Sequence, residues 1–202
     1  MSFLPAADGV ETAVFINCPY DAAFGPLFDA IFFTCVCCGC LPRSAIDSGS
    51  SGTARIERIM ATLRACRYSI HDLSRFQGEG EGNLARFNMP LELGMAMMLA
   101  ELAPGAHEWM PLAPTVSAFD QYISDLRGFD IERYDGTVST LVPKVAAWLL
   151  TRPAALGTVL TPQEMVEALP AFAAARRLLL RDWIGSAPPW SALVRIARET
   201  ID

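Results

Sequence analysis

Short β-forming runs alternate with segments of helical periodicity, and this alternation constrains the fold of the chain more than any other feature. An apolar run at Thr12–Asn17 ends in a turn, and apolar residues then recur at helical spacing from Ala22 to Cys38. A second strand is predicted at Leu41–Ile46, a second helix around Ile56–Leu63 and a third strand at Arg67–Asp72. Because strands that alternate with helices are joined by crossovers, the pattern predicts an α/β domain with a parallel sheet.

The alternation continues beyond the third strand with longer connections. A loop at Ser74–Asn88 precedes a helix from Pro90 to Leu102, which is apolar on most sides and is therefore predicted to be largely buried. A weak fourth strand is expected at His107–Pro114, then a short helix at Phe119–Leu126 and a clear helix at Val138–Leu150.

The composition changes after residue 152, which predicts a small helical C-terminal extension over residues 153–202 beside an α/β domain over residues 1–152. Two Ala- and Leu-rich helices are predicted in the extension, Pro162–Trp183 and Ser191–Ile201. Its apolar residues, Phe172, Leu178, Leu179 and Leu180 among them, are too many to leave in water. We therefore expect the extension to pack on the main domain or on a second subunit.

The overall charge argues against two classes of partner. The chain of 202 residues has 16 Lys and Arg against 22 Asp and Glu, a net charge of −6. A grip on nucleic acid or on an anionic membrane needs many cations, so neither partner is expected and any phosphate must be held locally. The apolar stretch Ala30–Leu41 is too short to span a bilayer, and Met1–Val10 lacks the pattern of a secretory signal, so a cytoplasmic protein is expected.

Four of the six cysteines lie close together, between Cys35 and Cys40. A zinc site usually takes its ligands from two separated pairs, and adjacent Cys37 and Cys38 would point to different faces of a helix. We predict that these residues are small apolar components of a core in a reducing compartment, with metal or redox chemistry as the alternative. No metal site is predicted.

Candidate functional residues gather where the predicted strands end, because ligands of an open parallel sheet bind beyond the carboxyl ends of its strands. Asp72 ends the third strand, and Glu92 falls in the predicted first turn of the following helix, so both carboxylates are expected at one edge of the sheet. The other candidates at this edge are Asn17, Cys18, Pro19, Tyr20, Arg43, Ser74 and Arg75.

Glu92 has the position expected of a nucleophile. A carboxylate in the first turn of a helix faces the positive end of the helix dipole and unpaired N–H groups, so we expect Glu92 to stay ionised. An ionised carboxylate can trap an oxocarbenium-like sugar, while a second carboxylate such as Asp72 binds sugar hydroxyls or handles the proton of the leaving base. The alternative is that Glu92 only complements its own helix and that Asp72 caps a turn.

Other polar residues near this edge have two interpretations each. His71 precedes Asp72 in a strand, so the two side chains point to opposite faces, and His71 is predicted to be packed rather than to act as an acid or base. Ser74 either binds a phosphate or makes a turn. Arg75 and Arg86 bracket a loop rich in Gly and Glu, and they either hold a phosphate or pair with glutamates at the surface.

Four segments resemble a bacterial group related to nucleoside 2-deoxyribosyltransferases and, more distantly, to TIR domains. They are Phe15–Asp21 (FINCPYD), Ile70–Arg75 (IHDLSR), Arg86–Gly94 (RFNMPLELG) and Tyr122–Gly128 (YISDLRG). The likeness covers roughly residues 12–150, and the Asn-Met-Pro-Leu-Glu-Leu-Gly stretch is its most specific part. It implies a flavodoxin-like sheet flanked by helices.

The resemblance also implies roles for individual residues. Glu92 of the Glu-Leu-Gly step would attack the anomeric carbon, Asp72 would contact base or sugar, and Asn17–Tyr20 would line the sugar side. Asn88, at the start of the most specific stretch, is expected among the substrate-binding residues. The transferases usually have an aspartate six residues before the nucleophile, where this chain has Arg86, and a cation there favours a nucleotide or NAD over a free nucleoside.

The sequence therefore predicts a hydrolase that cleaves the N-glycosidic bond of NAD or of a (deoxy)nucleotide and needs no cofactor. Kinship with the bacterial group implies a toxic effector of antiphage defence that forms a homo-oligomer or acts with a defence-system partner. A non-catalytic nucleotide-sensing or TIR-like assembly module is the first alternative. A nucleoside deoxyribosyltransferase of salvage is the second.

Overall fold

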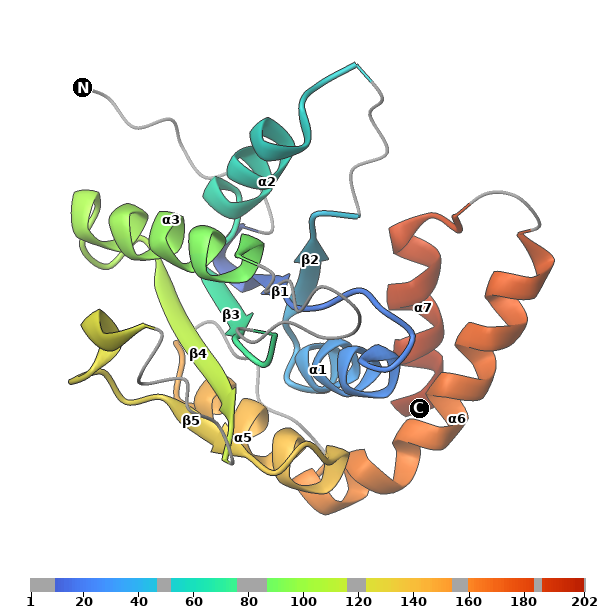
Figure 1. Ribbon diagram of the computed structural model, residues 1–202. Coiled ribbons are helices and arrows are strands. Elements are labelled where there is room, and N and C mark those ends of the chain that lie inside the picture. Colours follow the sequence, from blue (N-terminus) through green and yellow to red (C-terminus); the bar gives the residue numbers. More distant parts are fainter. Residues whose placement is uncertain are drawn as a thin grey trace, which may run out of the picture.

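The computed structural model describes residues 10–46, 52–75, 87–115, 123–153, 160–183 and 187–201. In this part of the chain all strands are parallel and form one sheet in the order β2-β1-β3-β4-β5 (Figure 1). The predicted α/β class with a flavodoxin-like sheet is thereby confirmed. The strands are β1 (Ala13–Asn17), β2 (Leu41–Ser44), β3 (Tyr68–Asp72), β4 (Glu108–Pro114) and β5 (Glu132–Tyr134).

Helices cover both faces of the sheet. On one face α1 packs against α5, and on the other face α2 and α3 lie beside each other (Figure 1). The helices are α1 (Gly25–Cys37), α2 (Arg55–Arg64), α3 (Asn88–Leu102), α5 (Val138–Leu150), α6 (Pro162–Asp182) and α7 (Trp190–Ile201), with 3-10 turns at Val10–Thr12 and Ser124–Leu126.

Alternation along β1 divides the core between the two faces of the sheet. Val14 and Ile16 belong to the cluster that includes α1 and α5, whereas Ala13 and Phe15 belong to the cluster beside α2 and α3. All five residues of β1 are buried, as they are in β3, because a parallel sheet is covered on both sides. The apolar runs of the sequence therefore occupy the central strands.

The C-terminal extension packs on the α/β domain. Helix α6 contacts α1 and α5, and α7 contacts α6 and α1. The ring of Phe172 stacks on Phe32 and Phe33 of α1, with centroids 5.7 and 5.2 Å away. The Trp190 indole donates a hydrogen bond to the carbonyl of Pro42 at 2.7 Å. The extension was expected to pack on the main domain or on a second subunit, and the structure shows that it packs on the main domain.

Not every apolar residue of the extension is buried. Phe172 is fully enclosed and Leu179 packs against the core, but Leu178 and Leu180 are exposed. The expectation that all of them would be covered was therefore wrong for two residues. The reason is geometric, because consecutive residues of a helix point in different directions and only one side of α6 faces α1.

The main differences from the prediction concern β5, the segment before residue 127 and the start of α3. Strand β5 was not predicted, because three residues with two charges carry little β signal. The helix expected at Phe119–Leu126 is only a 3-10 turn where the structure describes it, and residues 116–122 lie outside the described ranges. Helix α3 begins at Asn88 rather than at Pro90, since proline is tolerated in a first turn without having to open it. The prediction that this helix is largely buried was wrong: Met89, Glu92, Leu93 and Ala96 are its buried residues, because only one side of α3 faces the sheet, and apolar residues on its other side are exposed.

All six cysteines are buried free thiols. Five of them belong to the core cluster around α1, and Cys66 belongs to the cluster on the opposite face. Burial raises the pKa of Cys37 and of Cys38 to about 12, so both are protonated thiols at neutral pH. Separately, none of the helices in the described ranges is long and apolar enough to cross a membrane.

Candidate functional site

The strand order places a topological switch point between β1 and β3. The chain leaves β1 toward α1 on one face of the sheet and leaves β3 toward α3 on the other face. Open α/β sheets bind ligands beyond the carboxyl ends of their strands at such a point. The end of β1 meets the end of β3 and the beginning of α3 here, since Asn17 bonds to His71 and to Met89.

Asn17, at the end of β1, holds the beginning of α3. Its side-chain amide donates one hydrogen bond to the carbonyl oxygen of Met89 at 3.0 Å and a second to Nδ1 of His71 at 2.9 Å. Only 2% of Asn17 is exposed. The amide therefore uses both of its donors inside the protein, and it positions α3 three residues before Glu92.

A buried chain of hydrogen bonds continues from His71 across this face of the sheet. Nε2 of His71 lies 2.8 Å from Oγ of Ser69, and the same oxygen lies 2.8 Å from Nε2 of His107. Nδ1 of His107 donates to the carbonyl of Cys66 at 2.9 Å. The Asn17 amide donates to Nδ1 of His71, so the proton of His71 is on Nε2. The carbonyl of Cys66 accepts from Nδ1 of His107, so the proton of His107 is on Nδ1.

Burial keeps His71 from acting as an acid or base at neutral pH. Burial lowers the pKa of His71 to about 3, and the ring is fully enclosed. Its side chain points to the α3 side of the sheet, while that of Asp72 bonds to Tyr134 on the other side. The predicted opposition of these two side chains is thus observed, as is the packed role of His71.

Asp72 ends β3, and both of its carboxylate oxygens accept hydrogen bonds from the protein. Oδ2 accepts a hydrogen bond from the hydroxyl of Tyr134 at 2.6 Å, and Oδ1 accepts from the backbone N–H of Ser74 at 3.0 Å and from the Ser74 hydroxyl. The side chain has no exposed surface. Burial raises the pKa of Asp72, and the hydrogen bonds from Ser74 and Tyr134 oppose this shift.

Glu92 does not lie in the first turn of its helix, which corrects the prediction. Since α3 begins at Asn88, Glu92 is in the second turn, where backbone N–H groups have partners. Glu92 is 5% exposed, and burial raises the pKa of its carboxyl to about 7, while the charge of Arg55 opposes the shift. Glu92 is consequently a mixture of acid and carboxylate at neutral pH, rather than permanently ionised.

A small cavity of about 170 Å³ borders the Glu92 carboxyl. Asn88 and Arg55 supply its other polar groups, and the remaining lining is apolar. Pockets that enclose a whole drug-sized ligand measure about 300–1,000 Å³, so this cavity suits one ring of a larger ligand. It is lined by Arg55, Ile56, Ile59, Asn88, Leu91 and Glu92.

The Cys18 thiol, which follows β1, has a raised pKa. Burial is the main reason that its pKa is raised, and the negative charges of Asp72, Glu92 and Asp21 add to the effect. Asp72 and Glu92 thus both contribute to the electrostatic environment of the thiol, but Asp72 is not among the residues that line the cavity beside Glu92. The thiol itself stays protonated and is no nucleophile at neutral pH.

The remaining predicted residues have structural partners or fall outside the described part. Ser74 makes the turn through its bonds to Asp72, and Pro19 is buried beside Cys18. A guanidinium nitrogen of Arg75 lies 3.3 Å from a carboxylate oxygen of Asp21. Tyr20 is partly exposed and donates to the carbonyl of Ile16 at 2.8 Å. Arg86 lies in residues 76–86, outside the described ranges.

Sequence reasoning missed two residues of this region, Arg55 and Tyr134. Arg55 opens α2 after a Ser- and Gly-rich loop, and a cation at a helix start near the second strand was the available signal. Tyr134 ends β5 just before the turn formed by Asp135 and Gly136, but nothing local reveals that its hydroxyl reaches Asp72.

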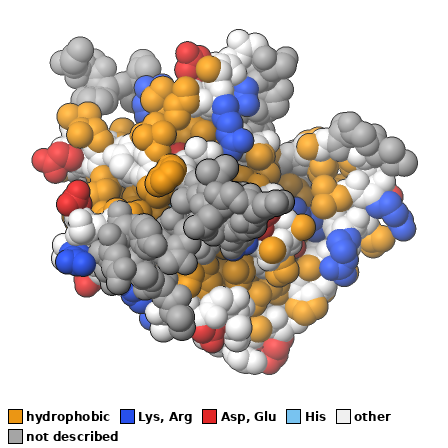
Figure 2. Space-filling view, in the orientation of Figure 1, with side chains coloured by type: hydrophobic (Ala, Val, Ile, Leu, Met, Phe, Trp, Pro, Cys, Tyr) orange, Lys and Arg blue, Asp and Glu red, His pale blue; other side chains and the backbone are white. Residues whose placement is uncertain are grey.

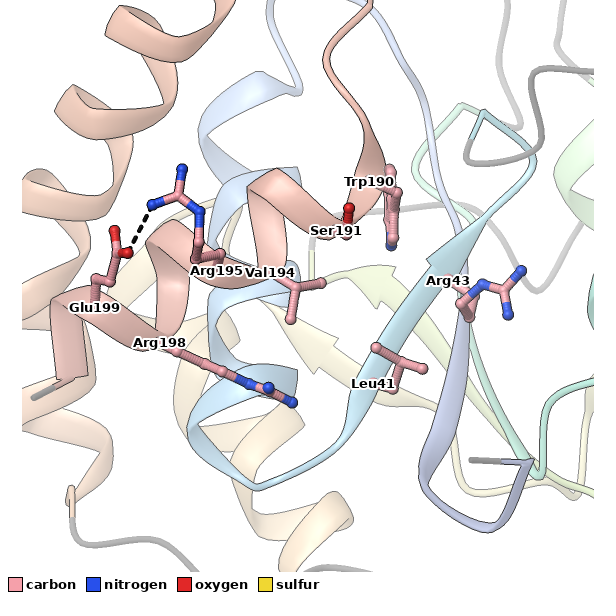
Figure 3. Close-up of a pocket in the computed structure, with 8 residues that line it drawn as sticks. All are labelled: Leu41, Arg43, Trp190, Ser191, Val194, Arg195, Arg198 and Glu199. Atoms are coloured by element: carbon pink, nitrogen blue, oxygen red, sulfur yellow. Dashed lines mark hydrogen bonds and ion pairs between the residues drawn. The ribbon is translucent and has the colours of Figure 1, made fainter. Parts of the chain in front are cut away.

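A second pocket lies away from the Glu92 cavity. It has a volume of about 520 Å³ and lies between the outer edge of β2 and α7, with Trp190 at one end (Figure 3). Its arginines do not converge, since Arg195 bonds to Glu199 at 2.6 Å while Arg43 points away from α7. Within the described ranges, no group of three or more His, Cys, Asp or Glu side chains is arranged to hold a metal ion.

Comparisons with known proteins do not assign the chain to a family. No protein-family model matches the chain, and no curated protein matches it significantly.

Proposed function

We propose that the protein cleaves the N-glycosidic bond of a nucleotide-type ligand, with Glu92 as the nucleophile. The observation that carries this proposal is the position of Glu92, which is 5% exposed and lines a small cavity between α2 and the beginning of α3. A buried carboxyl with a strongly shifted pKa in such a cleft is a candidate catalytic group. The resemblance to deoxyribosyltransferases points to the same residue.

The reaction proceeds by two displacements at the anomeric carbon. An oxygen of ionised Glu92 forms a bond to that carbon while its bond to the base nitrogen breaks, and the electron pair leaves with the base. Water then attacks the same carbon, the ester bond to Glu92 breaks, and a proton passes to solvent. A pyridinium base departs as a neutral molecule without protonation, so a ligand such as NAD needs no separate acid for the first step.

Burial and Arg55 set the charge of the nucleophile. Only the ionised carboxylate can attack, and the pKa of about 7 makes that form available at neutral pH. The Arg55 cation favours ionisation, and a cationic base in the cavity would favour it further. We propose that Asn88 contacts the sugar or base, since its side chain borders the same cavity.

The proposed ligand bears a phosphate. The net charge of −6 gives an anion no general attraction, so a local cation is required. Arg86 is proposed for this role on the basis of its sequence position, and Arg55 is a second cation at the cavity. The resemblance extends this proposal to an effector of antiphage defence.

One observation favours a second candidate, a module that senses a nucleotide without turnover. Both oxygens of Asp72 are already occupied by Tyr134 and Ser74, so the second carboxylate does not face a ligand freely. A site with one available carboxyl could bind a base and a sugar without hydrolysing their bond.

An assay with a matched variant tests the proposal. The purified full-length protein is mixed with NAD and with a panel of nucleotides, and release of free base is followed by chromatography. We expect release from at least one compound and its loss in Glu92→Gln, which keeps the shape of the side chain. Full turnover by Glu92→Gln would contradict the nucleophile assignment, and binding without release from any compound would favour the sensing module.

A further inference from the structure

Helix α3 presents an apolar stripe to solvent. Phe87, Leu91, Met98 and Leu102 are among the most exposed large apolar residues of the described chain, with Phe87 75% and Leu102 69% exposed. At 100° per residue these four positions fall on one narrow side of the helix. Hydrophobic side chains also gather over this region in the space-filling view (Figure 2). Monomers rarely leave a continuous apolar surface of this kind in water.

The stripe borders a groove between α2 and α3. The groove has a volume of about 570 Å³, and apart from Arg64 its lining is uncharged, with Met60, Met95 and Met98 among the lining residues. Leu91 lines both this groove and the cavity beside Glu92, so the two hollows are neighbours. Methionine-rich grooves suit helices as partners because the flexible side chains adapt to them.

Gly94 interrupts the stripe at its middle. A Cβ atom added there would have no other atom within 4 Å, so packing inside the chain does not require glycine. Glycine in a helix interior is less favourable than alanine, so its presence here calls for a reason. A notch of this kind allows a second backbone to approach closely, as small residues do at other helix–helix contacts.

The stripe is symmetric about this notch. An antiparallel copy of α3 centred between Gly94 and Met95 would place Leu91 opposite Met98 and Phe87 opposite Leu102. Such self-complementarity is the property required of an interface between two identical subunits.

The charges on α2 have the same symmetry. Glu57 in its first turn and Arg64 in its last turn are both exposed and lie seven residues apart, which puts them on one side of the helix. A two-fold axis reverses the direction of the helix, so Glu57 of one copy faces toward Arg64 of the other. A partner with its charges in the same order along a parallel helix would bring like charges together.

We propose that this surface, formed by α3 and the adjacent side of α2, binds a second copy of the chain in an antiparallel, two-fold dimer. Met98 and Leu91 form the apolar centre, Gly94 permits the close approach, and Glu57 and Arg64 orient the two copies. The dimer covers the groove that adjoins the Glu92 cavity. This arrangement is independent of whether the protein is an enzyme.

Sedimentation velocity of the full-length protein over a hundredfold concentration range tests the dimer. We expect a reversible dimer whose dissociation constant rises at least tenfold in Met98→Glu and in Gly94→Leu. Leu178→Glu is the matched control, since Leu178 is an equally exposed leucine on α6, 52% exposed against 56% for Met98. Circular dichroism and thermal melting establish that each variant is folded.

Charge reversal tests the orientation. Glu57→Arg and Arg64→Glu should each weaken the dimer about threefold, and the double variant should regain the affinity of the original protein. A protein that is monomeric over the whole range, or a dimer unaffected by Met98→Glu, would overturn the proposal. Failure of the double variant to recover would overturn the antiparallel arrangement.

Discussion

Glu92 is subject to two opposing influences. Its burial disfavours the carboxylate and raises the pKa to about 7, while the nearby Arg55 cation favours the carboxylate. The protein thus keeps a group that costs stability when charged and that would act as a nucleophile, in the proposed reaction, only when charged. This conflict is typical of residues retained for function rather than for folding.

The cost should appear as a pH-dependent difference between the original protein and Glu92→Gln. The pKa of Glu92 rises from 4.5 to about 7 on folding, so the folded state binds the proton more tightly and loses stability as pH rises through this interval. We expect the variant to gain about 3 kcal/mol in relative free energy of unfolding between pH 4.5 and pH 7. Urea unfolding at several pH values measures it, and a constant difference would show that Glu92 is not buried.

Ser69 is the central link of the buried chain between two histidines. Ser69→Ala would leave Nε2 of His71 without an acceptor and Nε2 of His107 without a donor. An unsatisfied buried polar group costs about 1–3 kcal/mol, so we expect the free energy of unfolding to fall by at least that amount. Ser124→Ala, at an exposed position, serves as the control and should change it little. Equal effects of the two substitutions would contradict the hydrogen-bond chain.

At the scale of elements, α6 is held to α1 by aromatic stacking and by an ion pair. Phe172 lies against Phe32 and Phe33, and a guanidinium nitrogen of Arg176 lies 3.1 Å from a carboxylate oxygen of Asp29. Asp29 is buried and Arg176 is its charged partner across the two helices. The contact therefore combines apolar burial with a polar restraint on register.

Phe172→Ala should remove most of this contact. Replacing a fully buried phenylalanine by alanine costs about 3–5 kcal/mol, since both transfer energy and packing are lost. The control Leu178→Ala concerns an exposed residue of the same helix and should change the free energy of unfolding by less than about 0.5 kcal/mol. Chemical denaturation compares the two variants. A small effect of Phe172→Ala would indicate that α6 is loosely attached.

At the scale of the whole molecule, the extension and the α/β domain share one core. Met165, Leu169 and Phe172 of α6 and Val194 and Ile196 of α7 belong to the same buried cluster as the residues of α1 and α5. The division at residue 152 is thus a change in composition along the chain rather than a gap between two cores.

Ending the chain after residue 153 should therefore expose a large apolar surface on α1 and α5. We expect the shortened protein to aggregate or to change its mass in light scattering, because the residues that α6 and α7 cover would meet water. A shortened protein of unchanged mass and stability would show that the extension is dispensable.

Much of the fold could be predicted because its signals are local. The apolar run of β1 and the helical periodicity of α1 or α5 depend on neighbours within a few turns of chain. The order of elements then restricts the topology, since crossovers between parallel strands are right-handed. Strand β5 escaped prediction because its three residues gain their strand structure by pairing with β4.

The candidate site also has features that the sequence determines and features that depend on the tertiary structure. The sequence by itself determined which residues stand at the ends of strands, Asn17 and Asp72 among them, because strand ends follow from local pattern and sheet edges follow from parallel order. Only the tertiary structure decided how far the site residues are buried, how readily they ionise and which hydrogen bonds they make. The burial that raises the pKa of Glu92 and the bond from Tyr134 to Asp72 arise from residues far apart in the chain. Desolvation and hydrogen bonding depend on what surrounds a group in space, and neighbours in sequence do not specify those surroundings.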